Sequence, residues 1–585
     1  MGAGSVSLIY ERMSAERKQA QNEGRYPEWF TTGGYQMFKE KYLYEADGFT
    51  AQTRRIAEEM ASHAPSFLPE DHPMFDRIVE SYGDNWADAF HSAIMQGHLA
   101  LSTPLLANGG TDRALPVSCS GGVVEDSVDG FYKARHEAAM LTKNGFGTSA
   151  YLGGIRHRGA TINTGGKASG SYVVARGFQQ DAREVSQGGV RRGSWAGYID
   201  LDHPDFDEWA DDLLREPSGK NIGWNISRDF LRRLDEGDEE ADRRYKRMMF
   251  IRALFGKGYI WKIDHANEQN PPMYVDRRLT VKASNLCTEI ALFADEEHTF
   301  TCVLSSLNAL HYEKWKDTGL AFLGLVFLDC VVESFLVRAR KIPGLEKAVR
   351  FTEKSRALGL GLLGLHSYFQ SKMIAFDSME AFFENGILFK HIDDETQMAT
   401  EWMAKEWGEP EWCKGYGVRN THRMAVAPNM SSATICGQVS QGIEPWLANA
   451  FIQNTPSGDM QRINPAFLKL AQERGMASEE LWDDINEHNG SVQHLDWLSD
   501  DEKAVFKTAF EINQEMIVRM ASNRQRYIDQ GQSLNLFFST EASEAYVSRI
   551  HEMALRDDYI KGLYYVRTMA GVKAAKETEC VACEG

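Results

Sequence analysis

The stretch Lys-Ala-Ser-Asn-Leu-Cys-Thr-Glu at residues 282–289 is the most informative part of the sequence. Asn285, Cys287 and Glu289 alternate along it, so on an extended strand or loop their side chains face the same side. A thiol, an amide and a carboxylate then meet in one small volume. This set of groups predicts a reactive site; a loop with incidental polar residues is the alternative.

Four more cysteines support the prediction of thiol chemistry. Cys302 follows in Thr-Cys-Val-Leu-Ser-Ser-Leu-Asn, and Cys119 precedes in Pro-Val-Ser-Cys. Each has apolar or small neighbours, where a single cysteine is usually inert packing. Cys580 and Cys583 form a CxxC pair at the end of the chain, where a mobile dithiol can exchange with a buried disulfide. Surface cysteines without a role are the alternative for this pair, but packing does not explain the whole set.

The composition excludes several classes of protein. The chain has 585 residues, 43% of them hydrophobic, which is enough for a large core and rules out general disorder. Its net charge of −19 argues against nucleic-acid binding. We identified no uncharged run near the roughly 18 apolar residues of a spanning helix, and no secretory signal. We therefore expect a cytoplasmic protein that does not enter membranes.

Metal binding by this chain is not expected. Eight cysteines include a single CxxC pair, whereas a zinc site usually needs two such pairs. A diiron centre in a helical bundle needs Glu-x-x-His pairs. None of the 16 histidines has a glutamate three residues before it.

The composition and the spacing of apolar residues change along the chain. Residues 1–95 are polar with helical apolar spacing, which predicts an N-terminal helical cap. Residues 96–565 combine short apolar runs, Gly-rich loops and helical stretches, which predicts an α/β domain. Residues 566–585 predict a flexible tail. Residues 320–370 suggest two buried helices, and the GxGxxG pattern at 359–364 suggests close helix packing rather than dinucleotide binding.

A series of motifs, in the family's order, resembles the large, catalytic subunit of ribonucleotide reductase, over about residues 100–585. Three are the cysteine motifs described above. The others are Asp-Ser-Val-Asp-Gly (126–130), Ser-Gln-Gly-Gly-Val-Arg-Arg-Gly (186–193), Arg-Ala-Leu-Gly-Leu-Gly (356–361), Ala-Pro-Asn-Met-Ser-Ser (427–432) with Gly-Ile-Glu-Pro (442–445), and Leu-Tyr-Tyr (563–565) with the terminal dithiol. The resemblance implies a ten-stranded α/β barrel whose central finger loop carries a cysteine.

The resemblance also implies a reaction, the reduction of ribonucleotides, expected to be ribonucleoside diphosphates, to deoxyribonucleotides. Cys287 holds the family's position for the thiyl radical that removes the 3′ hydrogen. Glu289 takes the place of the general base for the 3′-OH, and Asn285 that of a residue orienting the sugar. Cys119 and Cys302 match the dithiol that supplies the electrons.

Further roles follow from the same resemblance. The tail dithiol, Cys580 and Cys583, is expected to reduce the barrel disulfide and to be reduced by thioredoxin or glutaredoxin. Ser431 and Ser432 are expected to hold the substrate phosphates at a helix start. Thr103 and Ser118 match positions that contact the nucleotide.

The adjacent Tyr564 and Tyr565 resemble the radical-relay pair of class I reductases. In that class a separate metal-containing small subunit makes the radical, which agrees with the absence of Glu-x-x-His pairs here. An adenosylcobalamin-dependent class II reductase is the alternative. Asn429 and Met430 depart from relatives in the phosphate loop, which leaves the choice between diphosphates and triphosphates open.

Regulation by nucleotides is expected from the same family pattern. Asp126 and Ser127 resemble the start of the site where deoxynucleoside triphosphates or ATP act as effectors, at the interface of a homodimer. The segments 145–159 and 215–223 match its loops. No N-terminal ATP cone is visible, so we expect dATP to set specificity without shutting the enzyme down.

Two functions from other classes are alternatives. A thiol–disulfide oxidoreductase that uses the terminal CxxC alone does not explain Asn285, Glu289 or the paired serines. A regulatory subunit without activity predicts the loss of a site residue, yet all five cysteine positions are filled.

Overall fold

The chain folds around one nine-stranded mixed sheet in this computed structural model, which describes residues 3–187, 193–455 and 458–569. Eight strands follow the order β1-β7-β2-β3-β4-β5-β6-β12, and β8 also pairs with β7. The strands are β1 (Leu99–Leu101), β2 (Cys119–Val123), β3 (Gly147–Tyr151), β4 (Trp195–Asp200), β5 (Asn221–Ile226), β6 (Tyr259–Lys262), β7 (Phe300–Asn308), β8 (Leu358–Leu363) and β12 (Gly562–Leu563).

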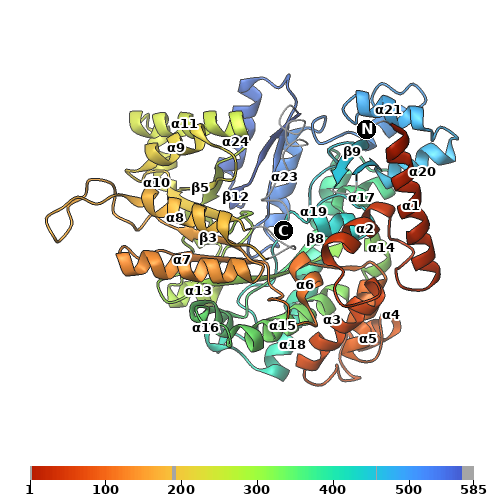
Figure 1. Cartoon of the computed structure of the whole chain (residues 1–585), viewed down its shortest axis with the longest axis horizontal. Helices are drawn as coiled ribbons and strands as arrows, with labels where there is room; N and C mark the ends of the chain where they lie inside the picture. The colour runs from red at the N-terminus through yellow and green to blue at the C-terminus, as the bar shows by residue number, and fades with distance from the viewer. Residues whose placement is uncertain (1–2, 188–192, 456–457, 570–585) are drawn as a thin grey trace.

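The sheet consists of two parallel runs that meet at an antiparallel junction. Strands β2 to β6 are parallel, as are β7 and β8, whereas β2 and β7 are antiparallel. Parallel neighbours need crossover connections, usually helical. The first run is crossed by helices on the left of Figure 1, namely α7 (Val128–Lys143), α8 (Ser171–Glu184), α9 (Phe206–Arg215), α10 (Arg228–Asp235) and α11 (Glu239–Phe255).

Two irregular segments continue the sheet from β8 round to β12. Residues 422–426 bond to β8 on one side and to residues 530–534 on the other, with N···O distances of 2.9 to 3.1 Å. Residues 530–534 bond in turn to Tyr564, next to β12, at 2.8 Å. The α/β barrel is thus present, but the expected count of ten strands is not confirmed, because these segments pair too sparsely to be regular strands.

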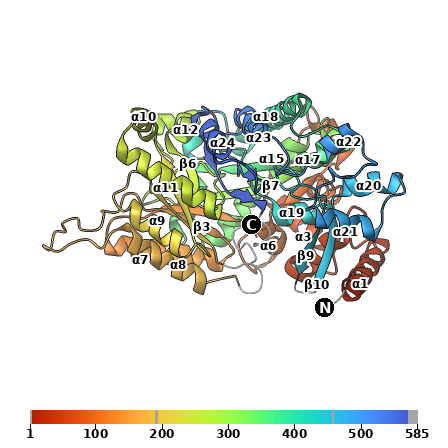
Figure 2. The same cartoon turned by 90° about the horizontal axis from the view of Figure 1, so that it is seen from above.

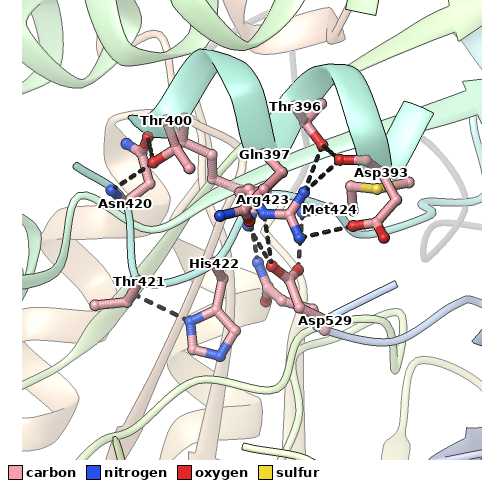
Figure 3. A network of polar contacts seen from close by, with 12 residues as sticks. Asp393, Thr396, Gln397, Thr400, Asn420, Thr421, His422, Arg423, Met424 and Asp529 are labelled. Carbon is pink, nitrogen blue, oxygen red and sulfur yellow. Dashed lines mark hydrogen bonds and ion pairs between the residues drawn. The ribbon is translucent and has the colours of Figure 1, made fainter. Parts of the chain in front are cut away.

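Arg423 and Asp529 fasten the irregular segments to helix α18 (Met379–Trp407), as Figure 3 shows. The Asp529 carboxylate accepts two consecutive main-chain N–H groups, the first from Arg423, at 2.8 and 2.9 Å. The Arg423 guanidinium donates to the Asp393 carboxylate and to the Thr396 hydroxyl, both at 2.7 Å. The carboxylate of Asp529 therefore satisfies main-chain donors that would otherwise be buried without partners.

The N-terminal region is helical, as expected, and lies at one end of the molecule (Figures 1 and 2). Ile56, Ala57 and Met60 give helix α3 a buried face. The elements of this region are α1 (Ala3–Asn22), α2 (Thr32–Met37), the π-helix η1 (Phe38–Tyr42), α3 (Phe49–His63), α4 (Phe75–Ser81) and α5 (Trp86–Met95).

Helix α15 (Leu320–Ala339) lies in the core. Seventeen of its 20 residues are buried, which is typical of a helix surrounded by other elements. Within the described residues it is the one helix long and apolar enough to cross a membrane, yet 89% of its most apolar window is buried inside the molecule. Its composition is therefore explained by its position in the core.

The expectation of two helices over residues 320–370 is wrong for the second half of that stretch. After α15 come α16 (Glu346–Ser355), strand β8 and α17 (Leu365–Ser371), and the GxGxxG pattern begins within β8. A Cβ atom on Gly361 would lie 2.5 Å from the carbonyl oxygen of Ala425. The glycines thus serve close packing, but between a strand and the segment 422–426.

The remaining elements surround the barrel. The loop between β3 and α8 projects from the body in both views (Figures 1 and 2). Regular structure continues through Thr568 in β13, past the expected start of the tail at residue 566. These elements are α6 (Thr103–Asn108), α12 (Ile263–Glu268), α13 (Pro272–Arg277), η2 (Ala309–His311), α14 (Tyr312–Trp315), η3 (Glu411–Cys413), α19 (Met430–Ile435), β9 (Ala450–Thr455), β10 (Gly458–Ile463), α20 (Pro465–Glu473), α21 (Glu479–Glu487), α22 (Asp500–Val505), α23 (Gln514–Gln525), β11 (Leu536–Phe538), α24 (Glu544–Arg556) and β13 (Val566–Thr568).

Candidate active site

Cys119 and Cys302 face each other across the antiparallel junction of the two parallel runs. Cys119 on β2 is the register partner of Cys302 on β7. Opposed residues in antiparallel strands have Cα atoms about 4.5 to 5.5 Å apart, which is within the range that a disulfide requires. Both residues are buried thiols in this structure. The fold therefore brings together two cysteines separated by 183 residues of sequence, the difference between 302 and 119.

A loop at residues 283–291 is held by side chains from several strands. The Ser149 hydroxyl on β3 donates to Ser284 O at 2.9 Å, and the Tyr198 hydroxyl on β4 donates to Asn285 O at 2.7 Å. The main-chain N–H of Gly531 donates to Glu289 O at 2.8 Å. We call this loop, which is bonded to β3, β4 and Gly531, the finger loop.

The finger loop turns at Cys287 instead of running extended. Thr288 has a φ of 66°, a left-handed conformation that a β-branched residue rarely adopts. The Asn285 Oδ1 atom accepts the main-chain N–H groups of Glu289 and Ile290 at 3.1 and 3.3 Å and so stabilises the turn. Such a backbone costs about 1–3 kcal/mol and persists only where its surroundings impose it.

Ser533 contacts both Cys287 and Glu289 in the turn. Its hydroxyl lies 2.7 Å from Cys287 O and 3.2 Å from Glu289 Oε2. Burial raises the pKa of Glu289 to about 7, and the neighbouring Asn285 and Ser533 side chains oppose this shift. A carboxyl group with this pKa can both accept and release a proton near neutral pH.

The Asn285 side chain ends in a buried amide nitrogen. Among the described residues this Nδ2 atom makes no hydrogen bond of regular geometry, although the amide is close enough to the Glu289 carboxyl group to lower its pKa, and the Oδ1 atom is used by the turn. A buried amide nitrogen without a partner is costly, at about 1–3 kcal/mol. The donor is thus available to a polar ligand beside Cys287 and Glu289.

Tyr564 and Tyr565 pack against Cys287. The Tyr564 hydroxyl lies 3.7 Å from Cys287 Sγ, and the two tyrosine rings have centroids 4.1 Å apart. Tyr259 on β6 extends the group, because its hydroxyl donates to the Tyr565 hydroxyl at 3.2 Å. The structure therefore places a continuous set of phenols next to the thiol of the finger loop.

Ser431 and Ser432 lie at the start of α19, beside the start of α6. The Ser432 hydroxyl donates to Leu101 O at 3.1 Å, two residues before Thr103. Asn429 adopts a left-handed conformation and does not cap α19 with its side chain, which bonds instead to Leu362 O and the Ser306 hydroxyl. The first main-chain N–H groups of α19 are thus left without a side-chain cap.

The other expected site residues lie in two places. Ser118 is buried next to Cys119. Asp126 and Ser127 lie instead at the start of α7. Asp126 pairs with Arg156 at 2.6 Å, and the Ser127 hydroxyl accepts the N–H of Gly130 at 2.9 Å. Cys580 and Cys583 fall outside the described residues.

Several residues around the site were given no role from the sequence. Each is a buried polar side chain whose partners are distant in sequence, and only Glu444 lies in one of the motifs, Gly-Ile-Glu-Pro. Glu444 is an example: burial raises its pKa to about 7, and Asn535 donates to it at 2.5 Å while accepting the N–H of Tyr565. The others are Tyr198, Tyr259, Gln530 and Ser533.

One group of side chains in the described part of the chain has the geometry to hold a metal ion. Asp484, His488 and His494 have possible ligand atoms within 4.8 Å of one another. They lie on α21 and the loop after it, at the surface. The thiols and carboxylate of the barrel form no such group among the described residues.

The fold and site together define a class: an α/β-barrel protein with a buried thiol on a loop and two facing thiols on neighbouring strands of the barrel. The family model described as ribonucleotide reductase, barrel domain, matches residues 117–221, 232–412 and 410–566. The chain therefore belongs to the ribonucleotide reductase large-subunit family.

Individual relatives agree with this assignment. A chain from Frog virus 3 (isolate Goorha) is 35% identical over 88% of this chain and 95% of its own length. The ribonucleoside-diphosphate reductase large subunit of Invertebrate iridescent virus 3 is 30% identical over 95% of this chain and 98% of its own. The solved class Id ribonucleotide reductase alpha subunit of Actinobacillus ureae is 36% identical, with a TM-score of 0.83, over 93% of this chain and 98% of that one.

Proposed function

We propose that this chain is the catalytic subunit of a class I ribonucleotide reductase that reduces ribonucleoside diphosphates. The observation that carries the proposal is the convergence at the finger loop. The Tyr564 hydroxyl lies 3.7 Å from Cys287 Sγ, and Ser533 joins the residues Cys287 and Glu289. A thiol with an adjacent phenol, and a carboxyl group with a pKa near 7, suit hydrogen-atom and proton transfer at one sugar.

The reaction divides among these residues as follows. The Cys287 thiyl removes the 3′ hydrogen atom, and Glu289 takes the 3′-OH proton as the 2′-OH, protonated by one thiol of the Cys119–Cys302 pair, leaves as water. The pair then gives a hydrogen atom to C2′ and an electron to the C3′ carbonyl, and so becomes a disulfide. Glu289 returns its proton to the 3′ oxygen, and the hydrogen returns from Cys287 to C3′. Asn285, through its Nδ2 atom, donates to a sugar hydroxyl.

Substrate is expected to bind with its phosphates at the start of α19. Ser431, Ser432 and Thr103 lie there together, and the uncapped N–H groups of α19 suit an anion. Ser118, beside Cys119, then contacts the nucleotide. The names of the relatives support a diphosphate, whereas Asn429 and Met430 give no independent evidence.

The radical is expected to come from a separate metal-containing small subunit through Tyr565 and Tyr564. The ring centroid distance of 4.1 Å between them supports transfer within the pair. The class I name of the solved relative supports this over an adenosylcobalamin-dependent reaction. The tail cysteines, Cys580 and Cys583, would then pass electrons from thioredoxin or glutaredoxin to the barrel pair.

Effector control is proposed for the start of α7. Asp126 binds Arg156, which lies on the projecting loop between β3 and α8. A deoxynucleoside triphosphate or ATP that competes for this contact favours one loop conformation through differential affinity. We expect this surface to lie at a homodimer interface.

A single-turnover experiment tests the proposal. Fully reduced chain is mixed with a small subunit and a ribonucleoside diphosphate, without added reductant. We expect deoxynucleotide in an amount matching the sum of the disulfides formed between Cys119 and Cys302 and between Cys580 and Cys583, as mapped by mass spectrometry. Disulfide formation without deoxynucleotide would favour a simple thiol–disulfide oxidoreductase instead.

A further inference from the structure

The buried side chain of Gln530 contacts one member of the dithiol pair. Its Nε2 atom donates to Leu358 O at 2.8 Å and lies 3.8 Å from Cys302 Sγ, within hydrogen-bonding range for sulfur. Its Oε1 atom accepts the N–H of Ala291 at 3.2 Å. The amide is thus fixed at both ends, with one N–H directed at the sulfur.

The main chain fixes Gln530 as firmly as its side chain does. Its N–H donates to Met424 O at 3.1 Å, and its carbonyl accepts from Gln525 Nε2 at 2.9 Å. The preceding residue, Asp529, belongs to the network that fastens this segment to Arg423 (Figure 3). The amide therefore does not need to reorganise when charge appears on the sulfur.

The two cysteines differ in access. Cys119 is 4% exposed and Cys302 is fully buried. Burial raises the pKa of the Cys302 thiol well above its ordinary value, and the contact with Gln530 opposes this shift. In thiol–disulfide exchange, the attacked sulfur must be accessible and the leaving sulfur must bear negative charge.

We propose that Gln530 is a positioning residue that makes Cys302 the leaving sulfur when a dithiol reductant attacks the Cys119–Cys302 disulfide. This inference rests on the proposed function for the reason why the disulfide forms. The exchange chemistry itself does not depend on nucleotide reduction. The reductant thiolate attacks Cys119 Sγ, a new S–S bond forms there, and the Cys119–Cys302 bond breaks. The electron pair stays on Cys302 Sγ, which accepts a hydrogen bond from Gln530. The second thiolate of the reductant then displaces Cys119, leaving a reduced pair and an oxidised reductant.

Gln532 offers a matched control. It is buried in the same segment, but its side chain bonds to Ala521 O, to Gln525 and to Arg524 Nε at 2.9, 3.0 and 2.6 Å. Gln530→Met and Gln532→Met therefore make the same substitution at similar burial. The first removes the donor to Cys302 and the second does not.

The experiment follows reduction of the barrel disulfide in the full chain carrying Cys580→Ser and Cys583→Ser. The pair is oxidised with diamide, and reduction by dithiothreitol is timed by alkylation and mass spectrometry. We expect Gln530→Met to slow reduction by about tenfold, the effect of losing one hydrogen bond of moderate strength to a charged group. Gln532→Met should stay within about twofold of the parent. Equal rates for both substitutions would overturn the proposal.

A second measurement needs no change at Gln530. Glutathione reacts with the oxidised parent chain, and the mixed disulfide is mapped by mass spectrometry. We expect it on Cys119, and a predominant adduct on Cys302 would overturn the assignment. Neither measurement requires nucleotide reduction. Failure of the proposed function would appear separately, as absence of deoxynucleotide from reduced parent chain supplied with a small subunit.

Discussion

At the scale of single residues, the site depends on groups that are unusual for a protein interior. Cys287 lies in a strained turn, held by Asn285 and by the left-handed Thr288. Glu289 is buried as a carboxyl group with its pKa raised to about 7. Buried polar groups and backbone strain of this kind are costly for stability and are concentrated at functional sites.

Cys287→Ser should abolish turnover. A serine hydroxyl has an O–H bond too strong to form the required radical readily, while its size preserves the turn. We expect deoxynucleotide formation to fall below detection, and equilibrium dialysis should show substrate binding within about threefold of the parent. Sustained multiple turnovers by this variant would contradict the assignment of Cys287.

Glu289 should give the reaction a pH dependence. Its folded-state pKa of about 7 means that the carboxylate needed as a base is lost as the pH falls through 7. We expect kcat/KM to rise between about pH 6 and 8 and then level off. Glu289→Gln should lower the rate by about 10²- to 10⁴-fold and abolish the rise of kcat/KM with pH. The same rise in Glu289→Gln would assign the titration to another group.

At the scale of elements, local patterns identified the helical N-terminal region but not the strand β8, and the finger loop was expected only from the family resemblance. The run of leucines and glycines at 358–364 fits a buried helix or a buried strand equally well, and only its partners in β7 and residues 422–426 decide. The segments that complete the barrel were not predicted either. Asp529 and Arg423 hold these segments in place through contacts between residues that are distant in sequence. Such contacts leave no periodic pattern.

Gly361→Ala should destabilise the barrel where β8 meets residues 422–426. The new Cβ would lie 2.5 Å from Ala425 O, a backbone atom that cannot move without breaking the pairing. We expect a loss of about 1–3 kcal/mol in the free energy of unfolding, measured by chemical denaturation. Gly154→Ala is the control, because a Cβ there meets nothing within 4 Å. Equal stability of both variants would contradict the described packing.

At the scale of the whole molecule, the barrel brings into one site residues from about 100 to 565 of the chain. The pairing of Cys119 with Cys302 could be proposed from the sequence only through a family resemblance. The sheet register supplies the physical reason, because the two cysteines oppose each other where β2 pairs antiparallel with β7. The contacts of Gln530 with Cys302 and of Ser533 with Cys287 follow from the closure of the barrel, which no local pattern encodes.

The terminal dithiol should be needed for protein reductants alone. In a chain with Cys580→Ser and Cys583→Ser, thioredoxin-driven turnover should fall to near zero, while dithiothreitol should still sustain turnover by reaching the barrel pair directly. Cys119→Ser or Cys302→Ser should fail with either reductant. Steady-state rates with each reductant check this expectation. Equal thioredoxin-driven rates in the tail variant and the parent would remove the tail from the pathway.

The most direct test of the central claim is nucleotide reduction by the purified chain with each possible radical source. The chain is supplied with a ribonucleoside diphosphate, dithiothreitol and either a class I small subunit or adenosylcobalamin. We expect deoxyribonucleoside diphosphate with the small subunit and none with adenosylcobalamin, and Tyr564→Phe should abolish the product. Turnover with adenosylcobalamin alone, or full activity of Tyr564→Phe, would contradict the account.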